Sequence, residues 1–227
     1  MGKDRRTAPK KTLRDGGRQV VDDVRQVEDL SIFQGGPKPR RLFYFTQPGW
    51  CINWLNDRRF PQRWHVLSRL GEPTESFLET VRRYVAWHRL PLLFVGDLNP
   101  HNLFVFALLR YGNTEFKPRR RDAIPVRYFG IDDRWLQLCT VQLKRGEELI
   151  TRALTDDNQE TLRVVKEVLP DLRELVGPRC FELLDTGRSF PFGAATNPRF
   201  YKRGFHDRLI EHLDTAPARA PRALLSQ

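Results

Sequence analysis

The sequence predicts an α/β fold in which helices flank a mostly parallel sheet. Three observations support this class. Short apolar strands alternate with helical segments, Gly and Pro residues separate them, and the continuous apolar run at residues 90–96 is typical of a strand covered on both faces. With 227 residues, of which 40% are hydrophobic, the chain is long enough to bury a sizeable core.

The N-terminal elements follow from local composition. Residues 1–18 are polar and basic, so we expect a flexible arm there. Gly and Pro residues at 35–39 predict a linker, and the apolar stretch at 41–46 predicts the first strong strand. A short helix is expected at 50–55 and a second strand at 64–67.

The middle of the chain alternates between helix and strand. From Thr74 onward, apolar residues recur at three- and four-residue steps, which predicts a helix capped by Thr74. The apolar strand at 90–96 leads into another helix, and a further strand is predicted at 126–131. Thr155 is predicted to cap a later helix that ends near Val168.

The chain after Thr151 is predicted to form a helical C-terminal extension. Residues 185–199 are rich in Gly, Pro and Asn and are expected to form a loop, whereas 205–213 is an amphipathic helix. We expect four parts: a flexible basic arm at 1–30, an α/β domain at 31–150, the helical extension at 151–214 and a disordered tail at 215–227.

Charge supplies the first functional hint. Lys and Arg number 39 against 28 Asp and Glu, so the formal net charge is +11. Such a surplus favours polyanions through counterion release, and nucleic acid is the obvious partner, although a solvated basic surface without a partner is the alternative. No secretory signal or membrane-spanning run is evident, and the three cysteines form no metal-binding pattern. We therefore expect an intracellular protein, cytoplasmic and nucleoid-associated or nuclear, that is not secreted and has no membrane partner.

Polar residues follow two of the predicted strands. Ligands of open α/β sheets bind at the carboxyl ends of strands, next to a switch in strand order. Thr46 and Gln47 follow one strand, and Asp97 and Asn99 follow another. Taken alone, the Asp97 segment is equally consistent with a helix cap and with a site.

A series of five segments resembles, in order, the Toprim domain of topoisomerase VI A subunits and meiotic double-strand-break transesterases. The stretch LLFVGDLNPHN at 92–102 is similar to the family's apolar strand followed by Asp-x-Asp-Pro, a variable residue and Gly. The helix ending in RYGN at 110–113 resembles the family's Lys-Tyr-Gly-Ser. The other similar segments are 60–73, 123–131 and 154–157, and residues 42–55 occupy the place of the family's first Toprim strand. The resemblance implies a Toprim-type, Rossmann-like domain at 31–150.

The resemblance also implies a magnesium site. In the family, a strand-end Glu and the Asp-x-Asp pair hold Mg²⁺, which stabilises the charge that develops when a tyrosine from a winged-helix domain attacks a DNA phosphodiester. The Glu falls on Gln47, the two Asp residues fall on Asp97 and Asn99, and the glycine falls on Asn102. Because only Asp97 keeps a carboxylate, we expect Mg²⁺ binding to be weak.

Other residues modify that expectation. Asp132 and Asp133 lie just past the next strand and could lend a carboxylate, although an exposed turn is the favoured interpretation. Gln47 and Asn99 match changes that an experimenter would introduce to inactivate an enzyme, whereas Asn102 favours natural divergence. The five tyrosines fall on strands, helix faces or the C-terminal loop, so none is assigned the catalytic role.

We therefore expect a protein that binds double-stranded DNA without autonomous cleavage, a pseudoenzyme of the type IIB topoisomerase A-subunit kind. By analogy with the family it would form a homodimer, with a partner protein supplying a winged-helix or ATPase function. Two alternatives remain: a metal-dependent DNA-cleaving component whose nucleophile lies on a partner chain, and a scaffold domain for protein–protein contacts.

The candidate DNA contacts are basic side chains in two places. His101 and Arg110 are expected to flank Asp97, and the loop after their helix is rich in Lys and Arg. A dense basic loop suits contact with a phosphate backbone, although these side chains could simply solvate the loop. The five tryptophans are expected to be core residues. The loop residues assigned to DNA are Lys117, Arg119, Arg120 and Arg121.

Overall fold

The computed structural model describes residues 14–15, 18–19, 23–27, 30–34, 38–46, 64–69, 71–119, 121–195, 197 and 199–215. The predicted helix at 50–55, Gln47, Arg120 and nearly all of the predicted C-terminal tail lie outside these residues. The strands are β1 (Arg14–Asp15), β2 (Arg18–Gln19), β3 (Asp23–Val27), β4 (Leu30–Gln34), β5 (Arg41–Phe45), β6 (Trp64–Ser68), β7 (Leu92–Val95), β8 (Val126–Tyr128), β9 (Arg152–Ala153) and β10 (Arg188–Ser189). The helices are α2 (Glu75–His88), α3 (Pro100–Tyr111), α4 (Asp133–Gln142), α5 (Asp156–Val168), α6 (Leu172–Val176), α7 (Pro178–Asp185), α8 (Phe192–Ala195) and α9 (Phe205–Asp214).

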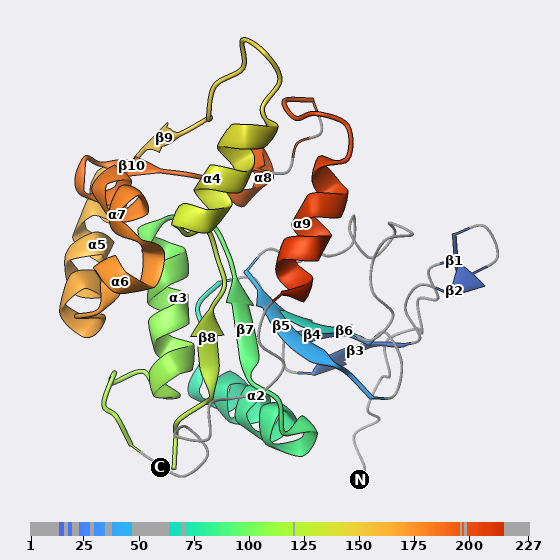
Figure 1. Cartoon of the computed structure of the whole chain (residues 1–227). Helices are drawn as coiled ribbons and strands as arrows, with labels where there is room; N and C mark the ends of the chain where they lie inside the picture. Colours follow the sequence, from blue (N-terminus) through green and yellow to red (C-terminus); the bar gives the residue numbers. More distant parts are fainter. Residues whose placement is uncertain are drawn as a thin grey trace, which may run out of the picture.

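A six-stranded sheet forms the centre of the fold, in the order β3-β4-β6-β5-β7-β8 (Figure 1). The four strands β6, β5, β7 and β8 are parallel, whereas β3 and β4 pair antiparallel at one edge. The predicted α/β class with a mostly parallel sheet flanked by helices is therefore confirmed. After β5 the chain goes to β6 on one side and then returns to β7 on the other, so the strand order switches between β5 and β7.

One face of the sheet carries an aromatic ladder. Tyr44, Phe94 and Tyr128 are register partners on β5, β7 and β8, and their rings stack with centroids 5.8 and 5.9 Å apart. Phe77 of α2 contacts Tyr44, and Phe106 of α3 contacts Phe94. Helices α2 and α3 therefore cover this face, and α5 packs on the outer side of α3.

The opposite face of the sheet is covered by elements from the C-terminal half. Phe45 of β5 contacts Phe192 of α8, which in turn packs on Trp135 of α4. His212 of α9 lies against Trp135 and stacks on Phe129, which follows β8. The C-terminal extension thus shares one hydrophobic core with the sheet.

Two helix starts follow the predicted capping chemistry. The Thr74 hydroxyl accepts a hydrogen bond from the Phe77 backbone N–H at the start of α2. The Thr155 hydroxyl accepts from the Asn158 N–H at the start of α5, which ends at Val168 as predicted. A side-chain acceptor satisfies an N–H group that would otherwise lack a partner at a helix N-terminus.

Three local predictions differ from the structure. Within the segment expected to be a flexible arm, β3 pairs with β4 and extends the central sheet. Strand pairing gives backbone N–H and C=O groups their hydrogen-bond partners whatever the side chains are, so side-chain composition did not predict it. The segment expected to be a loop at 185–199 contains β10 and α8. Trp87, expected in the core, is 83% exposed on α2, while Trp64 and Trp135 are buried.

Within the part of the chain that the structure describes, no helix combines the length and apolar character needed to cross a bilayer.

Candidate functional site

The carboxyl ends of β5 and β7 meet at the switch in strand order. Phe45 and Val95 are register partners at the ends of the two strands, and the backbone N–H of Thr46 donates to the Val95 carbonyl over 3.4 Å. Thr46, Asp97 and Asn99 therefore lie together at one edge of the sheet. This is the place where open α/β sheets bind ligands.

A hydrogen-bonded polar cluster fills this corner, centred on Asn102 in the first turn of α3. The Asn102 Oδ1 accepts from the Thr46 hydroxyl and from the Asp97 backbone N–H, the latter over 3.2 Å. The Asn102 amide N–H₂ donates to Asn99 Oδ1 over 3.0 Å. Asn99 also caps α3 by accepting from the Asn102 backbone N–H at 2.7 Å. Asn102, placed by the resemblance where the family has glycine, thus connects both strand ends.

The cluster depends on a close approach at Gly96. A Cβ atom at this position would lie 2.5 Å from Asn102 Oδ1 and 3.1 Å from Thr46 Oγ1. The first distance is shorter than Cβ contacts adopt and the second is tight, so a side chain at this position would displace Asn102 from the strand ends.

Asp97 is the one carboxylate of the cluster, and it acts as a helix cap. Its Oδ1 accepts from the Phe192 backbone N–H at the start of α8 over 2.6 Å, and its Oδ2 accepts from the Asn99 amide over 3.3 Å. Burial raises the pKa of Asp97 above its ordinary value, while the bond from Phe192 and the nearby positive charge of Arg152 act in the opposite direction. The carboxylate is therefore already engaged by groups of the protein itself.

The donor set at this corner fits Mg²⁺ poorly. The ion prefers octahedral coordination that includes carboxylates, and here one buried carboxylate bonded on both oxygens stands among neutral amides. Across the described residues, no three His, Cys, Asp or Glu side chains come together as metal ligands. Gln47, the third position assigned to the site, lies outside the described residues.

Asp132 and Asp133 do not supply the missing carboxylates. Asp132 caps α4 by accepting from the backbone N–H groups of Arg134 and Trp135. Asp133 accepts from the N–H groups of Arg179 and Cys180 at the start of α7. The interpretation of an exposed turn was wrong, because both carboxylates satisfy helix N-termini.

The predicted DNA-contact residues separate into two groups. His101 is exposed in the first turn of α3, close to Asn99 and Asn102. Arg110 lies nine residues further along the same helix, about 14 Å away at 1.5 Å per residue. Arg110 also pairs with Asp171 at 2.8 Å, next to α6. The expectation that Arg110 flanks Asp97 was therefore wrong, because the two residues lie at opposite ends of α3.

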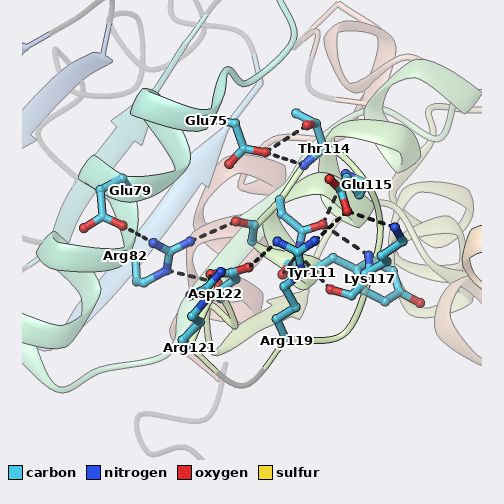
Figure 2. Close-up of polar contacts among 12 residues, drawn as sticks. Glu75, Glu79, Arg82, Tyr111, Thr114, Glu115, Lys117, Arg119, Arg121 and Asp122 are labelled. Atoms are coloured by element: carbon cyan, nitrogen blue, oxygen red, sulfur yellow. Dashed lines mark hydrogen bonds and ion pairs between the residues drawn. The ribbon is translucent and has the colours of Figure 1, made fainter.

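The described residues of the basic loop, Lys117, Arg119 and Arg121, lie at the amino end of β8, opposite the Asp97 corner (Figure 1). Figure 2 shows that the neighbourhood of this loop is a network of ion pairs and hydrogen bonds. Arg82 of α2 donates to the Asp122 carbonyl at 3.0 Å and to the Gly112 carbonyl at 2.9 Å. Arg82 thus ties α2 to both ends of the loop that joins α3 to β8.

Acidic neighbours partly neutralise this loop. Glu115 lies 3.1 Å from the Lys117 ammonium and 2.6 Å from the Arg119 guanidinium, as Figure 2 shows. Asp122 lies 3.9 Å from Arg119 and 3.6 Å from Arg121. The loop is therefore less available to phosphate groups than its sequence indicates.

The tyrosine hydroxyls are held inside the protein. Those of Tyr84, Tyr111 and Tyr128 bond to the His65 ring, the Val168 carbonyl and the Ile131 carbonyl respectively. The Tyr201 hydroxyl bonds with the Cys139 thiol, and burial raises the pKa of both groups. Tyr44 is fully buried, and burial raises its pKa as well. For Tyr44, Tyr128 and Tyr201, burial raises the pKa of the hydroxyl and so opposes formation of a nucleophilic phenolate.

Sequence reasoning missed a second basic region, which lies at the carboxyl end of the sheet. The segments LKRG at 143–146 and YKRG at 201–204 come together there, far apart in sequence. The signal was present in the shared Lys-Arg-Gly pattern, but nothing in the sequence shows that the two copies are neighbours. The basic side chains of this region, all exposed, are Lys144, Arg145, Arg199, Lys202 and Arg203.

Two comparisons with known proteins add no relative. A scan against protein-family models finds no family that matches this chain, and a search of curated proteins finds no significant match.

Proposed function

We propose that this protein binds double-stranded DNA as a Toprim-like protein related to the topoisomerase VI A subunit, without cleaving DNA by itself. The observation that carries the proposal is the corner at the switch in strand order. Two positions that the resemblance assigns to the metal site, Asp97 and Asn99, meet there at one sheet edge, and Asn102 joins them.

The same corner supports the absence of autonomous cleavage. Phosphodiester cleavage of the family's kind needs a metal ion to offset the charge that develops on the phosphate. Asp97 is engaged as the cap of α8, and Asn99 is neutral and engaged as the cap of α3. Chemistry at this corner would require Asp97 to leave its present partners.

Charge supports DNA as the partner. The net charge of +11 favours a polyanion, and the residues that face solvent at the carboxyl end of the sheet include His101 and Arg152. Contacts of this kind go mainly to phosphates, so we expect little preference for base sequence. Homodimerisation and a partner that supplies a nucleophile or an ATPase remain part of the proposal by analogy with the family.

The test is a titration of the purified full chain against supercoiled plasmid in the presence of Mg²⁺, Mn²⁺ or EDTA, read for both mobility shift and nicking. We expect a mobility shift of equal strength with metal and with EDTA, and no nicked product. The variant Asp97→Ala should behave like the native chain in both readouts, and Asp157→Ala, at an exposed position of α5, is the matched acid-to-alanine control.

Two results would contradict the proposal. Nicks that require metal and disappear in Asp97→Ala but not in Asp157→Ala would show that the corner still supports cleavage. No shift at low salt would remove DNA as the partner and favour the scaffold alternative.

A further inference from the structure

The two Lys-Arg-Gly segments form a crossing with approximate twofold symmetry, called here the basic crossing (residues 141–146 and 199–204). Leu143 and Tyr201 pair antiparallel at its centre. On one side the Lys144 N–H donates to the Phe200 carbonyl at 3.0 Å, and on the other the Lys202 N–H donates to the Gln142 carbonyl at 2.8 Å. The backbones are therefore joined reciprocally.

The two lysine side chains repeat this reciprocity. The Lys144 ammonium donates to the Arg199 carbonyl and the Lys202 ammonium donates to the Val141 carbonyl, each over 2.8 Å. Each segment then ends in a glycine with left-handed backbone, Gly146 at φ 84° and Gly204 at φ 88°. The lysines hold the segments together while each ammonium keeps further N–H groups for a ligand.

Buried aromatic residues fix the crossing to the core. Tyr201 is 3% exposed, and its ring stacks on Phe205 of α9 with centroids 4.0 Å apart. Its hydroxyl bonds with Cys139 of α4. The charged side chains therefore project from a backbone that packing already orders, which lowers the entropy lost on binding.

Three guanidinium groups at the crossing remain available. Across the described residues, no ion pair joins Arg145, Arg199 or Arg203 to a carboxylate within 4.0 Å. In sequence, Glu147 and Glu148 follow Arg145 in the same loop, and Asp207 follows Arg203 in the first turn of α9. The five basic side chains of the crossing and these three acidic neighbours sum to a net charge of +2, and all five basic side chains lie in two short adjacent segments.

We infer that the basic crossing is the surface on which this protein holds the phosphate backbone of duplex DNA. The inference rests on the proposed function and specifies its contact surface. Both segments lie beyond the carboxyl ends of β7 and β8, at the top of Figure 1, at the same end of the sheet as Asp97 and His101. Guanidinium groups bind phosphate oxygens through paired N–H groups, so three of them on an ordered support suit successive phosphates of a backbone.

The experiment measures the salt dependence of binding to a duplex of about 30 base pairs. The variant Arg145→Gln, Arg199→Gln, Arg203→Gln keeps both lysines that join the segments. Each phosphate contact contributes about 0.9 to the slope of log affinity against log salt, so losing three should lower the slope by about 2.7. Two duplexes of unrelated sequence should give the same change, because phosphate contacts do not read bases.

Two further variants serve as controls. The variant Lys117→Gln, Arg119→Gln, Arg121→Gln removes the same charge from the loop at the amino end, where Glu115 and Asp122 already pair with these side chains, and should change the slope by less than about 0.9. The triple Arg→Lys variant of the crossing keeps the charge and should keep the slope. Because this variant changes the same three positions without removing charge, it shows whether a lower slope in the Arg→Gln variant comes from lost charge or from damage to the fold.

The outcomes distinguish this inference from the proposed function. Normal DNA binding by the native chain with an unchanged slope in the Arg→Gln variant of the crossing would overturn the inference alone. An equal fall in the slope for the loop variant would overturn it too, because binding would then depend on total positive charge and not on the basic crossing. No binding by the native chain would overturn both.

Discussion

The two ends of the central sheet use basic side chains in opposite ways. At the amino end, Arg82 bonds to two backbone carbonyls, and Arg119 pairs with Glu115 and Asp122. At the carboxyl end, Arg145 and Arg203 are exposed, with no ion pair to a carboxylate among the described residues. The described basic side chains at the amino end therefore have acidic or carbonyl partners, whereas Arg145 and Arg203 at the carboxyl end have no carboxylate partner among the described residues.

This difference teaches that density of charge in a sequence does not identify a binding surface. The loop at 117–121 has the sequence KPRRR, yet Glu115 and Asp122 pair with its described basic side chains, Lys117, Arg119 and Arg121. The basic crossing is divided between two segments of the chain and becomes one surface only after folding. What distinguishes the two is the supply of acidic partners, which the tertiary structure decides.

The largest effect should come from Gly112, which ends α3 at the amino end. Its φ is 69°, and a Cβ atom there would lie 1.6 Å from the Asp122 carbonyl oxygen. We expect Gly112→Ala to lower the free energy of unfolding by about 3 kcal/mol, because the left-handed backbone and the collision add together. Urea denaturation measures this loss.

Gly146 at the carboxyl end provides the matched control. Its φ is 84°, but a Cβ atom there would meet nothing within 4 Å. Gly146→Ala should therefore lower the free energy of unfolding by about 1 kcal/mol, the cost of placing alanine in a left-handed backbone conformation. Equal losses for the two variants would mean that the amino-end loop is not packed as tightly as this comparison requires.

The next effect concerns Arg82, the side chain that ties α2 to the loop. We expect Arg82→Met to lower the free energy of unfolding by about 2 kcal/mol, because the carbonyls of Gly112 and Asp122 lose charged donors. The control is Arg83→Met on the same helix. Arg83 is exposed and, among the described residues, its ion pair is with Glu79, so its loss should stay within about 0.5 kcal/mol. Similar denaturation midpoints for the two variants would show that Arg82 acts as a surface charge.

Sequence patterns predicted those parts of the fold that depend on near neighbours in the chain. The caps at Thr74 and Thr155 were correct because capping needs only a hydroxyl and an N–H three residues later. The strand at 90–96 was correct in kind, since an apolar run of that length suits a buried parallel strand, and β7 is its central part.

The parts that sequence could not predict depend on contacts distant in the chain. The Asp97 carboxylate accepts a hydrogen bond from the N–H of Phe192, 95 residues away, so a local sequence motif could not predict that it caps α8. The symmetry of the basic crossing likewise requires residues near 143 and 201 to meet. Position within α3 could have separated Arg110 from Asp97, because nine residues of helix span about 14 Å.

The smallest effect is a pH dependence of stability at the carboxyl end. Burial raises the pKa of Asp97, and the hydrogen bond from the Phe192 N–H lowers it, so the net shift is smaller than burial alone would give. A raised pKa means that the folded chain keeps this proton at pH values where the unfolded chain has lost it. The stabilisation from the proton is complete below the ordinary value of 3.8 and is lost as the pH rises to the raised pKa of the folded state. Above that pKa both states are ionised, and the contribution no longer changes.

Asp97→Asn removes this titration. Urea denaturation across the acidic range measures the free energy of unfolding of both proteins. The value for Asp97→Asn should rise relative to that of the native chain as the pH increases through this window. Asp157→Asn, exposed in the first turn of α5, is the matched control for the loss of one carboxylate. If the Asp97→Asn and native curves stay parallel, the carboxylate is hydrated rather than buried, and the carboxyl end would then be open to a metal ion after all.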